Sequence, residues 1–201
     1  MKKILAITLA LAMCFALGMT AFAADVTTDG GSGSTPVYLS STEDGSLGGT
    51  PAATAMSVTV PTALPMAMAQ NGDVTTADNC QIINNSYGAV RVKSVTISAE
   101  GGWSLTSYGD KSTLASEKVD SNKLGFALAI GGGNQVTTDA SDAASQQLIS
   151  APITGCFMSG VGNPSANTVS VDYSAIVTPL SSPVTDANVA NVVFIIEWDV
   201  A

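Results

Sequence analysis

The chain has 201 residues, of which 46% are hydrophobic and only 11% are charged, with a formal net charge of −9. Its 16 acidic residues outnumber its seven basic ones, and this balance argues against a nucleic acid or an anionic membrane surface as a partner. The chain contains no histidine, which excludes the usual general base of serine and cysteine hydrolases and the usual ligand of catalytic zinc.

Residues 1–23 have the three parts of an export signal. Residues 2–3 are lysines, residues 4–17 form an uncharged apolar run, and residues 21–23 read Ala-Phe-Ala, a small-x-small cleavage pattern. The apolar run is shorter than the about 20 residues that a membrane-spanning helix needs. Cleavage after residue 23 of 201 leaves 178 residues, and the loss of two lysines changes the net charge from −9 to −11. The segment predicts a secreted, cell-surface protein without a membrane span.

A lipoprotein signal is a second interpretation of the same segment. Residues 11–14 read Leu-Ala-Met-Cys and resemble a lipobox that ends at Cys14. However, Met13 is larger than the small residue that usually precedes the cysteine, and the apolar run continues past it. These two features favour a cleaved export signal.

Composition divides the remaining chain into a leader and one domain. Residues 24–53 are rich in Gly, Ser, Thr and Asp, which predicts a flexible leader with little to pack. Residues 54–201 alternate apolar with small or polar residues, between clusters of Gly, Pro, Asn and Asp. This pattern is typical of many short strands, so we expect a single β-rich domain.

The alternation predicts about eight strands and no βαβ units. The segment 89–98 is the longest strand signal in the first half, and its apolar phase changes near residue 93, which predicts a bulge or a strand that passes between two sheets. Segments 124–130 and 169–177 also alternate clearly. The final strand, 192–200, directs four apolar side chains to one face: Phe194, Ile196, Trp198 and Val200. The predicted fold is all-β, a β-sandwich of the immunoglobulin-like or jelly-roll-like kind.

Two weaker patterns are ambiguous in their chemistry. Residues 131–146 are polar and predict a long loop, in which Asp139 and Asp142 are candidate calcium ligands without the spacing of an EF-hand. Whether that loop binds calcium stays open. The glycines at 131–133 resemble a phosphate-binding loop, but no Lys-Ser or Lys-Thr follows them, so a hairpin or connecting loop is the better interpretation. Residues 112–118 give the main helical pattern in the domain.

Three strand carboxylates are candidates for acid–base chemistry. Glycosidases need two carboxylates about 5–10 Å apart, and Glu197 and Asp199 share one face of the last strand at about 7 Å. Asp172 lies on another predicted strand. A solvated outer face explains all three equally well and is favoured. The sequence therefore predicts no enzyme, no cofactor and no metal site.

Two cysteines, Cys80 and Cys156, follow the export signal. In an exported protein an even pair favours a disulfide. Two free thiols are the alternative, as expected in a reducing habitat. The sequence leaves both interpretations open.

Two short motifs carry a resemblance. Trp103-Ser104-Leu105 follows a valine-rich strand, and Trp198-Asp199-Val200 repeats it in the last strand with Val in place of Leu. The domain resembles the WxL family of Gram-positive surface proteins, which have a proximal and a distal Trp-x-Leu motif. The resemblance covers about residues 56–201 and implies a β-rich domain held non-covalently on peptidoglycan.

A looser likeness concerns extracellular fibres. The leader and the Asn-Asn-Ser stretch at residues 84–86 are similar to those of camelysin-type exported matrix proteins. The leading hypothesis is thus a non-enzymatic surface protein that associates with the cell wall or with other surface proteins. A self-associating subunit of a fibre or biofilm matrix is the first alternative, and a carbohydrate-binding module is the second.

Overall fold

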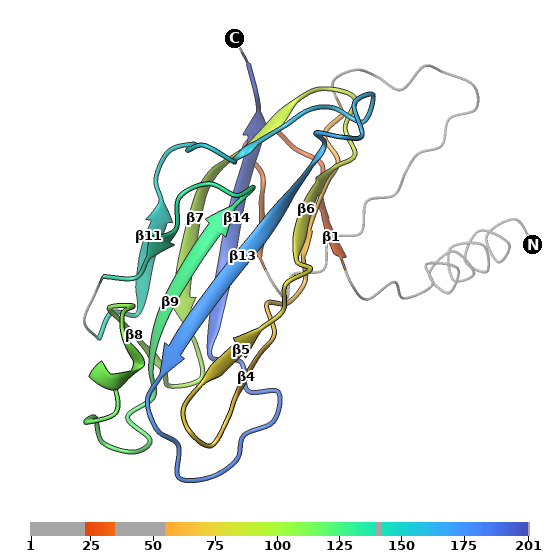
Figure 1. Cartoon of the computed structure of the whole chain (residues 1–201). Helices are drawn as coiled ribbons and strands as arrows, with labels where there is room; N and C mark the ends of the chain where they lie inside the picture. The colour runs from red at the N-terminus through yellow and green to blue at the C-terminus, as the bar shows by residue number, and fades with distance from the viewer. Residues whose placement is uncertain (1–22, 35–54, 140–141, 201) are drawn as a thin grey trace, which may run out of the picture.

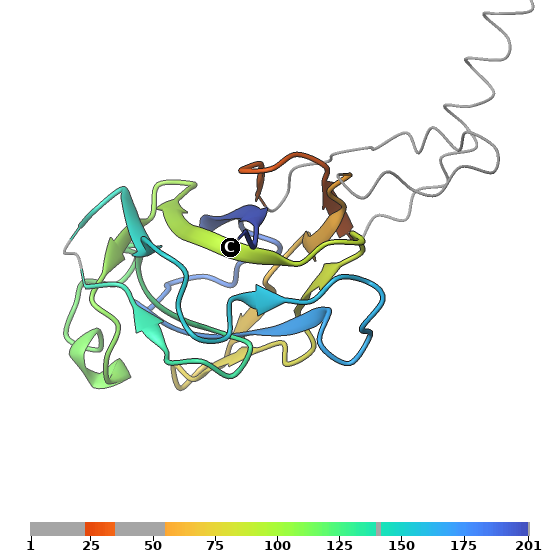
Figure 2. The same cartoon turned by 90° about the horizontal axis from the view of Figure 1, so that it is seen from above.

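The computed structural model describes residues 23–34, 55–139 and 142–200. Within these ranges the chain forms two packed β-sheets, a separate hairpin and one short 3-10 helix, η1 (Lys111–Thr113). The two sheets lie one over the other when seen along the strands (Figure 2). The prediction of an all-β sandwich is confirmed.

Seven strands form the first sheet, in the order β1-β3-β6-β13-β9-β10 with β8 beside β9. The β8–β9 pair is parallel, and the other pairs are antiparallel. The strands of this sheet are β1 (Ala23–Val26), β3 (Val58–Pro61), β6 (Gln81–Asn84), β8 (Ser104–Thr106), β9 (Lys123–Ile130), β10 (Val136–Thr137) and β13 (Thr168–Val177).

Five strands form the second sheet, in the order β11-β7-β14-β2 with β12 beside β7. The strands are β2 (Ser32–Ser34), β7 (Val90–Ala99), β11 (Ser145–Ile149), β12 (Phe157–Met158) and β14 (Ala190–Trp198). A hairpin of β4 (Met66–Met68) and β5 (Val74–Thr76) forms its own two-stranded sheet.

One hydrophobic core fills the space between the two sheets. Alternate residues of the long strands point inward, as the pleat requires, and these side chains are almost wholly buried. β7 keeps its apolar face inward through the predicted bulge. Ile195 of β14 pairs with Ser94, but Ile196 pairs with Val92, so Lys93 is the extra residue. The bulge is therefore confirmed, and β7 stays in one sheet.

The sandwich has two distinct ends, which Figure 1 shows as top and bottom. At the C-terminal end, β14 finishes at Trp198, which pairs with Val90. At the opposite end, which we call the hairpin end, Ala190 pairs with Ala99 and the β4–β5 hairpin lies alongside. The nine residues of β14 separate the two ends by about 30 Å.

The leader prediction is wrong for the part that the structure describes. β1 pairs with β3, and β2 pairs with β14, so residues 23–34 complete the edges of both sheets. These segments have no apolar alternation, because they join the sheets through backbone hydrogen bonds. Residues 1–22 of the predicted export signal, and residues 35–53 of the predicted leader, lie outside the described residues.

Three smaller expectations also differ from the structure. The predicted loop 131–146 contains β10 and the start of β11. The helical pattern at 112–118 gives only the short η1. Val200, predicted to belong to the last strand, lies beyond the end of β14 and is 68% exposed.

Candidate functional site

The proximal Trp-x-Leu motif lies at the hairpin end. Trp103 follows the turn after β7, where its backbone N–H donates to the carbonyl of Glu100 (2.9 Å). Leu105 is fully buried in β8 beside β9. The Trp103 ring is only half-buried and packs on the edge of the core. The motif thus has a buried anchor and a tryptophan that faces an open space.

The distal motif lies at the C-terminal end. Trp198 is half-buried, and its ring lies so close to Gly88 that a Cβ there would be 2.9 Å from Cζ3. Its backbone N–H donates to the Asp29 carboxylate (2.6 Å), which ties β14 to the segment before β2. Val200, the third residue of the motif, is exposed. Of the four side chains predicted to share one face of the last strand, Phe194 and Ile196 are buried in the core, Trp198 packs against it, and Val200 lies outside it.

The structure does not bring the two motifs together. They lie at opposite ends of the sandwich, separated by the length of β7. Each end therefore presents one partly exposed tryptophan, and a single ligand the size of a disaccharide cannot contact both.

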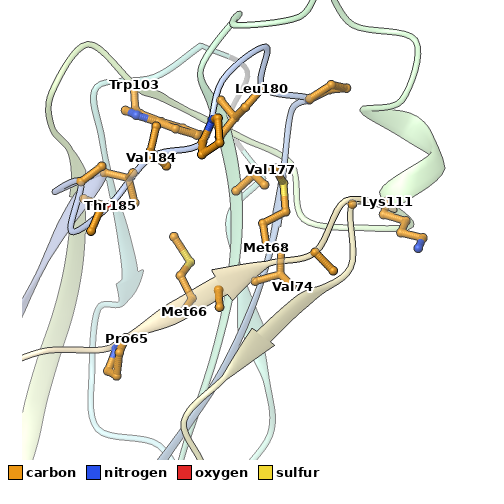
Figure 3. Close-up of a pocket in the computed structure, with 18 of the residues that line it drawn as sticks. Pro65, Met66, Met68, Val74, Trp103, Lys111, Val177, Leu180, Val184 and Thr185 are labelled. Carbon is orange, nitrogen blue, oxygen red and sulfur yellow. The ribbon is translucent and has the colours of Figure 1, made fainter.

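A large apolar groove opens at the hairpin end, with a volume of about 1350 Å3. Four parts of the chain form most of it: the β4–β5 hairpin with the residues before it, the loop 178–189 between β13 and β14, the segment 110–115 around η1, and Trp103. In Figure 3, Met66 and Met68 point from β4 into the space that Trp103, Leu180 and Val184 border from the other side. No sequence pattern indicates this groove, because its walls come from segments far apart in the chain.

The hairpin is held against the sandwich by Tyr173. The Tyr173 hydroxyl donates to the carbonyl of Pro65 (2.5 Å) and accepts from the N–H of Ala77 (3.2 Å), so it bridges both arms of the hairpin. Thr76 adds a hydrogen bond from its hydroxyl to the Tyr173 carbonyl (2.9 Å). Burial raises the pKa of Tyr173 to about 12, so the hydroxyl stays a donor at physiological pH.

The opposite wall of the groove is anchored by polar contacts. Asp120 accepts hydrogen bonds from the N–H (2.8 Å) and hydroxyl (2.5 Å) of Ser181, and these hydrogen bonds lower the pKa of Asp120. The hydroxyl of buried Thr178 accepts from the N–H of Lys123 (3.0 Å). Loop 178–189 is therefore anchored by hydrogen bonds near its start, whereas its residues 181–188 are exposed.

The groove contains little charge. Residues 62–72 have no charged side chain, and loop 178–189 has only Asp186. Lys111 lies at the side of the groove and forms an ion pair with Asp73, which lowers the pKa of that carboxyl. Asp110 also lines the groove, but its carboxylate accepts from the N–H of Ser112 (2.8 Å). The lining suits an apolar occupant better than an ionic one.

The strand carboxylates do not form an acid–base pair. Glu197 accepts from Arg91 Nε (2.7 Å) and from Lys93 Nζ (3.0 Å), and these two cations lower its pKa. Asp199 lies 3.3 Å from Arg91. Asp172 is exposed on the other sheet, where its carboxylate accepts from the Ser170 hydroxyl (2.8 Å). These groups stabilise the outer faces, as the sequence analysis favoured.

The two cysteines are free thiols, and the predicted alternative of a disulfide does not form in this structure. The carbonyl of Cys80 accepts from Val171 of the first sheet, and the carbonyl of Cys156 accepts from Val92 of the second. Burial raises the pKa of both thiols, which makes them poor nucleophiles at neutral pH.

The glycine-rich turn is a hairpin and not a ligand loop. Gly131 and Gly132 have positive φ values of 56° and 69° and lead from β9 into β10, which pairs with it. A Cβ at Gly131 would lie 2.4 Å from the carbonyl oxygen of Gly155, so the turn packs directly on a neighbouring backbone. Asp142, a candidate calcium ligand, accepts from Lys123 (3.3 Å). No group of three or more potential metal ligands occurs among the described residues.

Among the residues described, no helix is both long and apolar enough to cross a membrane. No family model, curated protein or solved structure matches the chain.

Proposed function

We propose that the protein is a non-enzymatic secreted surface protein that associates non-covalently with the peptidoglycan of a Gram-positive cell wall. The observation that carries the proposal is the pair of WxL-like motifs in a β-sandwich, Trp103-Ser104-Leu105 and Trp198-Asp199-Val200, behind a segment with the pattern of an export signal. Each motif presents a half-buried tryptophan near the surface. Such rings combine apolar area with one N–H donor, which suits contacts with sugar and peptide.

The side-chain chemistry supports a binding role over catalysis. The chain lacks histidine, the thiols of Cys80 and Cys156 have raised pKa values, and Glu197 is neutralised by two cations. A structural or adhesive protein needs none of these groups in a reactive state.

The test is sedimentation of the purified protein with isolated Gram-positive cell walls. We expect the protein in the pellet, and we expect binding to stay equal or increase as salt rises from low to physiological concentration. The protein and teichoic acids are both anionic, and their repulsion is screened within about 8 Å at physiological salt. Walls stripped of teichoic acids provide the control, and they should bind at least as much protein at low salt.

Soluble peptidoglycan fragments identify the ligand, because they should release the bound protein. Recovery of all the protein in the supernatant at every salt concentration would contradict the proposal.

A second candidate function is a subunit of an extracellular fibre or matrix. The observation that favours it is that both ends of the sandwich expose large apolar side chains, Met68 and Val184 at the hairpin end and Tyr87 and Val161 at the C-terminal end.

A further inference from the structure

We infer that the groove at the hairpin end binds the C-terminal end of a second copy of this chain, so that copies join head to tail. This contact does not depend on wall binding, and it gives the fibre hypothesis a specific interface. Four observations carry it: the size of the groove, its apolar lining, the exposed side chains at the other end, and the distribution of charge.

The groove has room for a protein surface. Its volume of about 1350 Å3 exceeds the roughly 300–1,000 Å3 typical of small-molecule sites. Met68 and Val184 on its border are 37% and 57% exposed, although both are apolar. Unbranched methionine side chains adapt to irregular partners, so Met66 and Met68 suit a protein contact.

The C-terminal end presents the complementary surface. Tyr87, Phe157, Val161 and Val200 are large apolar side chains with exposed fractions of 70%, 47%, 48% and 68%. Isolated exposed apolar residues are common, but a cluster of them marks an interaction site. We call these four residues the apolar tip.

Backbone contacts show that the apolar tip is continuous. The N–H of Val161 donates to the carbonyl of Ser86 (2.8 Å), which places it beside Tyr87. The N–H of Asp199 donates to the carbonyl of Ala89 (3.0 Å), which places Val200 near the same turn. Phe157, Ala89 and Asp199 also line one small hollow. The tip therefore joins three separate segments at one end of the molecule.

Few charged side chains border the two surfaces. The segments 80–90 and 157–171, which form most of the tip, contain no charged residue, and neither does the groove segment 62–72. Asp199 borders the tip beside Val200, where it pairs with Arg91, and Asp110, Lys111 and Asp186 line the groove. On a chain of net charge −9, like-charge repulsion between copies is weaker where charged side chains are few. The groove and the tip are different surfaces at opposite ends, so the contact is heterologous and extends into open chains.

Sedimentation velocity of the purified protein over a concentration series tests this contact with three exposed substitutions. Val184→Asp places a charge in the groove, and Tyr87→Asp places one on the tip. Val119→Asp is the matched control, because Val119 is 53% exposed and lines neither surface. All three positions are exposed, so the variants should fold.

We expect the wild type and Val119→Asp to form larger species as concentration rises. Val184→Asp and Tyr87→Asp should each associate at least about tenfold more weakly, because a carboxylate would be buried without a partner. An equimolar mixture of the two should form dimers and nothing larger. The intact groove of one variant accepts the intact tip of the other, and both remaining surfaces are blocked.

Three results would overturn the inference. If the wild type stays monomeric at every concentration, the contact between groove and tip does not form. A small apolar molecule bound to that monomer in native mass spectrometry would then assign the groove to a ligand. Unchanged association of Val184→Asp would place the contact elsewhere. A mixture that stays monomeric would exclude pairing of groove with tip. Wall binding of the monomeric variants tests the proposed function separately.

Discussion

At the scale of single residues, Tyr173 does most to define the groove. Its hydroxyl is the only side-chain group among the described contacts that bonds to backbone on both sides of the β4–β5 hairpin, at Pro65 and Ala77. The apolar alternation of residues 169–177, to which Tyr173 belongs, was visible in the sequence. The two hydrogen bonds of its hydroxyl could not be predicted, because they join residues 96 and 108 positions apart.

We expect Tyr173→Phe to lower the free energy of unfolding at neutral pH by about 1–2 kcal/mol, because a buried hydrogen-bonded hydroxyl is lost. The folded state holds the pKa at about 12, above the value of about 10 for free tyrosine, so the wild type loses this stabilisation as pH rises from about 10 to 12. The difference between wild type and variant should therefore shrink over that range. Denaturant unfolding at several pH values measures it.

Tyr87→Phe is the control for this prediction, because the Tyr87 side chain is exposed and its substitution should change stability little at any pH. A constant difference between Tyr173→Phe and the wild type from pH 9 to 12 would show that the Tyr173 hydroxyl does not hold the hairpin.

At the scale of elements, strands with regular apolar alternation were predictable and short edge strands without it were not. β7, β9 and β13 have regular apolar alternation, and the phase change in β7 located its bulge at Lys93. β1 and β2 read Ala-Ala-Asp-Val and Ser-Gly-Ser, which contain no apolar period. β10 and β11 read Val-Thr and Ser-Gln-Gln-Leu-Ile, too short to show an apolar period, and they pair along the edges of β9 and β7.

The edge position of β1 and β2 leads to a prediction for a chain that lacks residues 24–53. The described core residues all lie from Met56 onward, so this variant should still unfold cooperatively. Its melting temperature should fall by roughly 5–10 °C, because β3 and β14 lose their edge partners. The bare edges should also promote aggregation. Thermal unfolding followed by circular dichroism gives the first value, and light scattering gives the second.

Asp29→Ala provides a smaller version of the same change, since it removes only the carboxylate that accepts from the N–H of Trp198. An unchanged melting temperature in the truncated chain would show that β1 and β2 do not pair with the sheets. Complete loss of the thermal transition would show that the leader supplies part of the core.

At the scale of the whole molecule, each end of the sandwich presents its own surface. Arg91 and Lys93 of β7 form ion pairs with Glu197 of β14, next to the C-terminal end. The hairpin end and the C-terminal end each combine apolar exposed residues with one tryptophan. The sequence predicted two tryptophan motifs, but only the fold shows that they belong to opposite ends.

The central claim is that attachment to the wall is non-covalent, and the mass of the wall-bound protein tests it most directly. Cells that express the protein are fractionated, and the wall fraction is extracted with a strong denaturant before any muramidase is added. We predict that the denaturant releases the protein with the mass of the polypeptide alone. Release only after wall digestion, with the mass of attached peptidoglycan fragments, would contradict the claim.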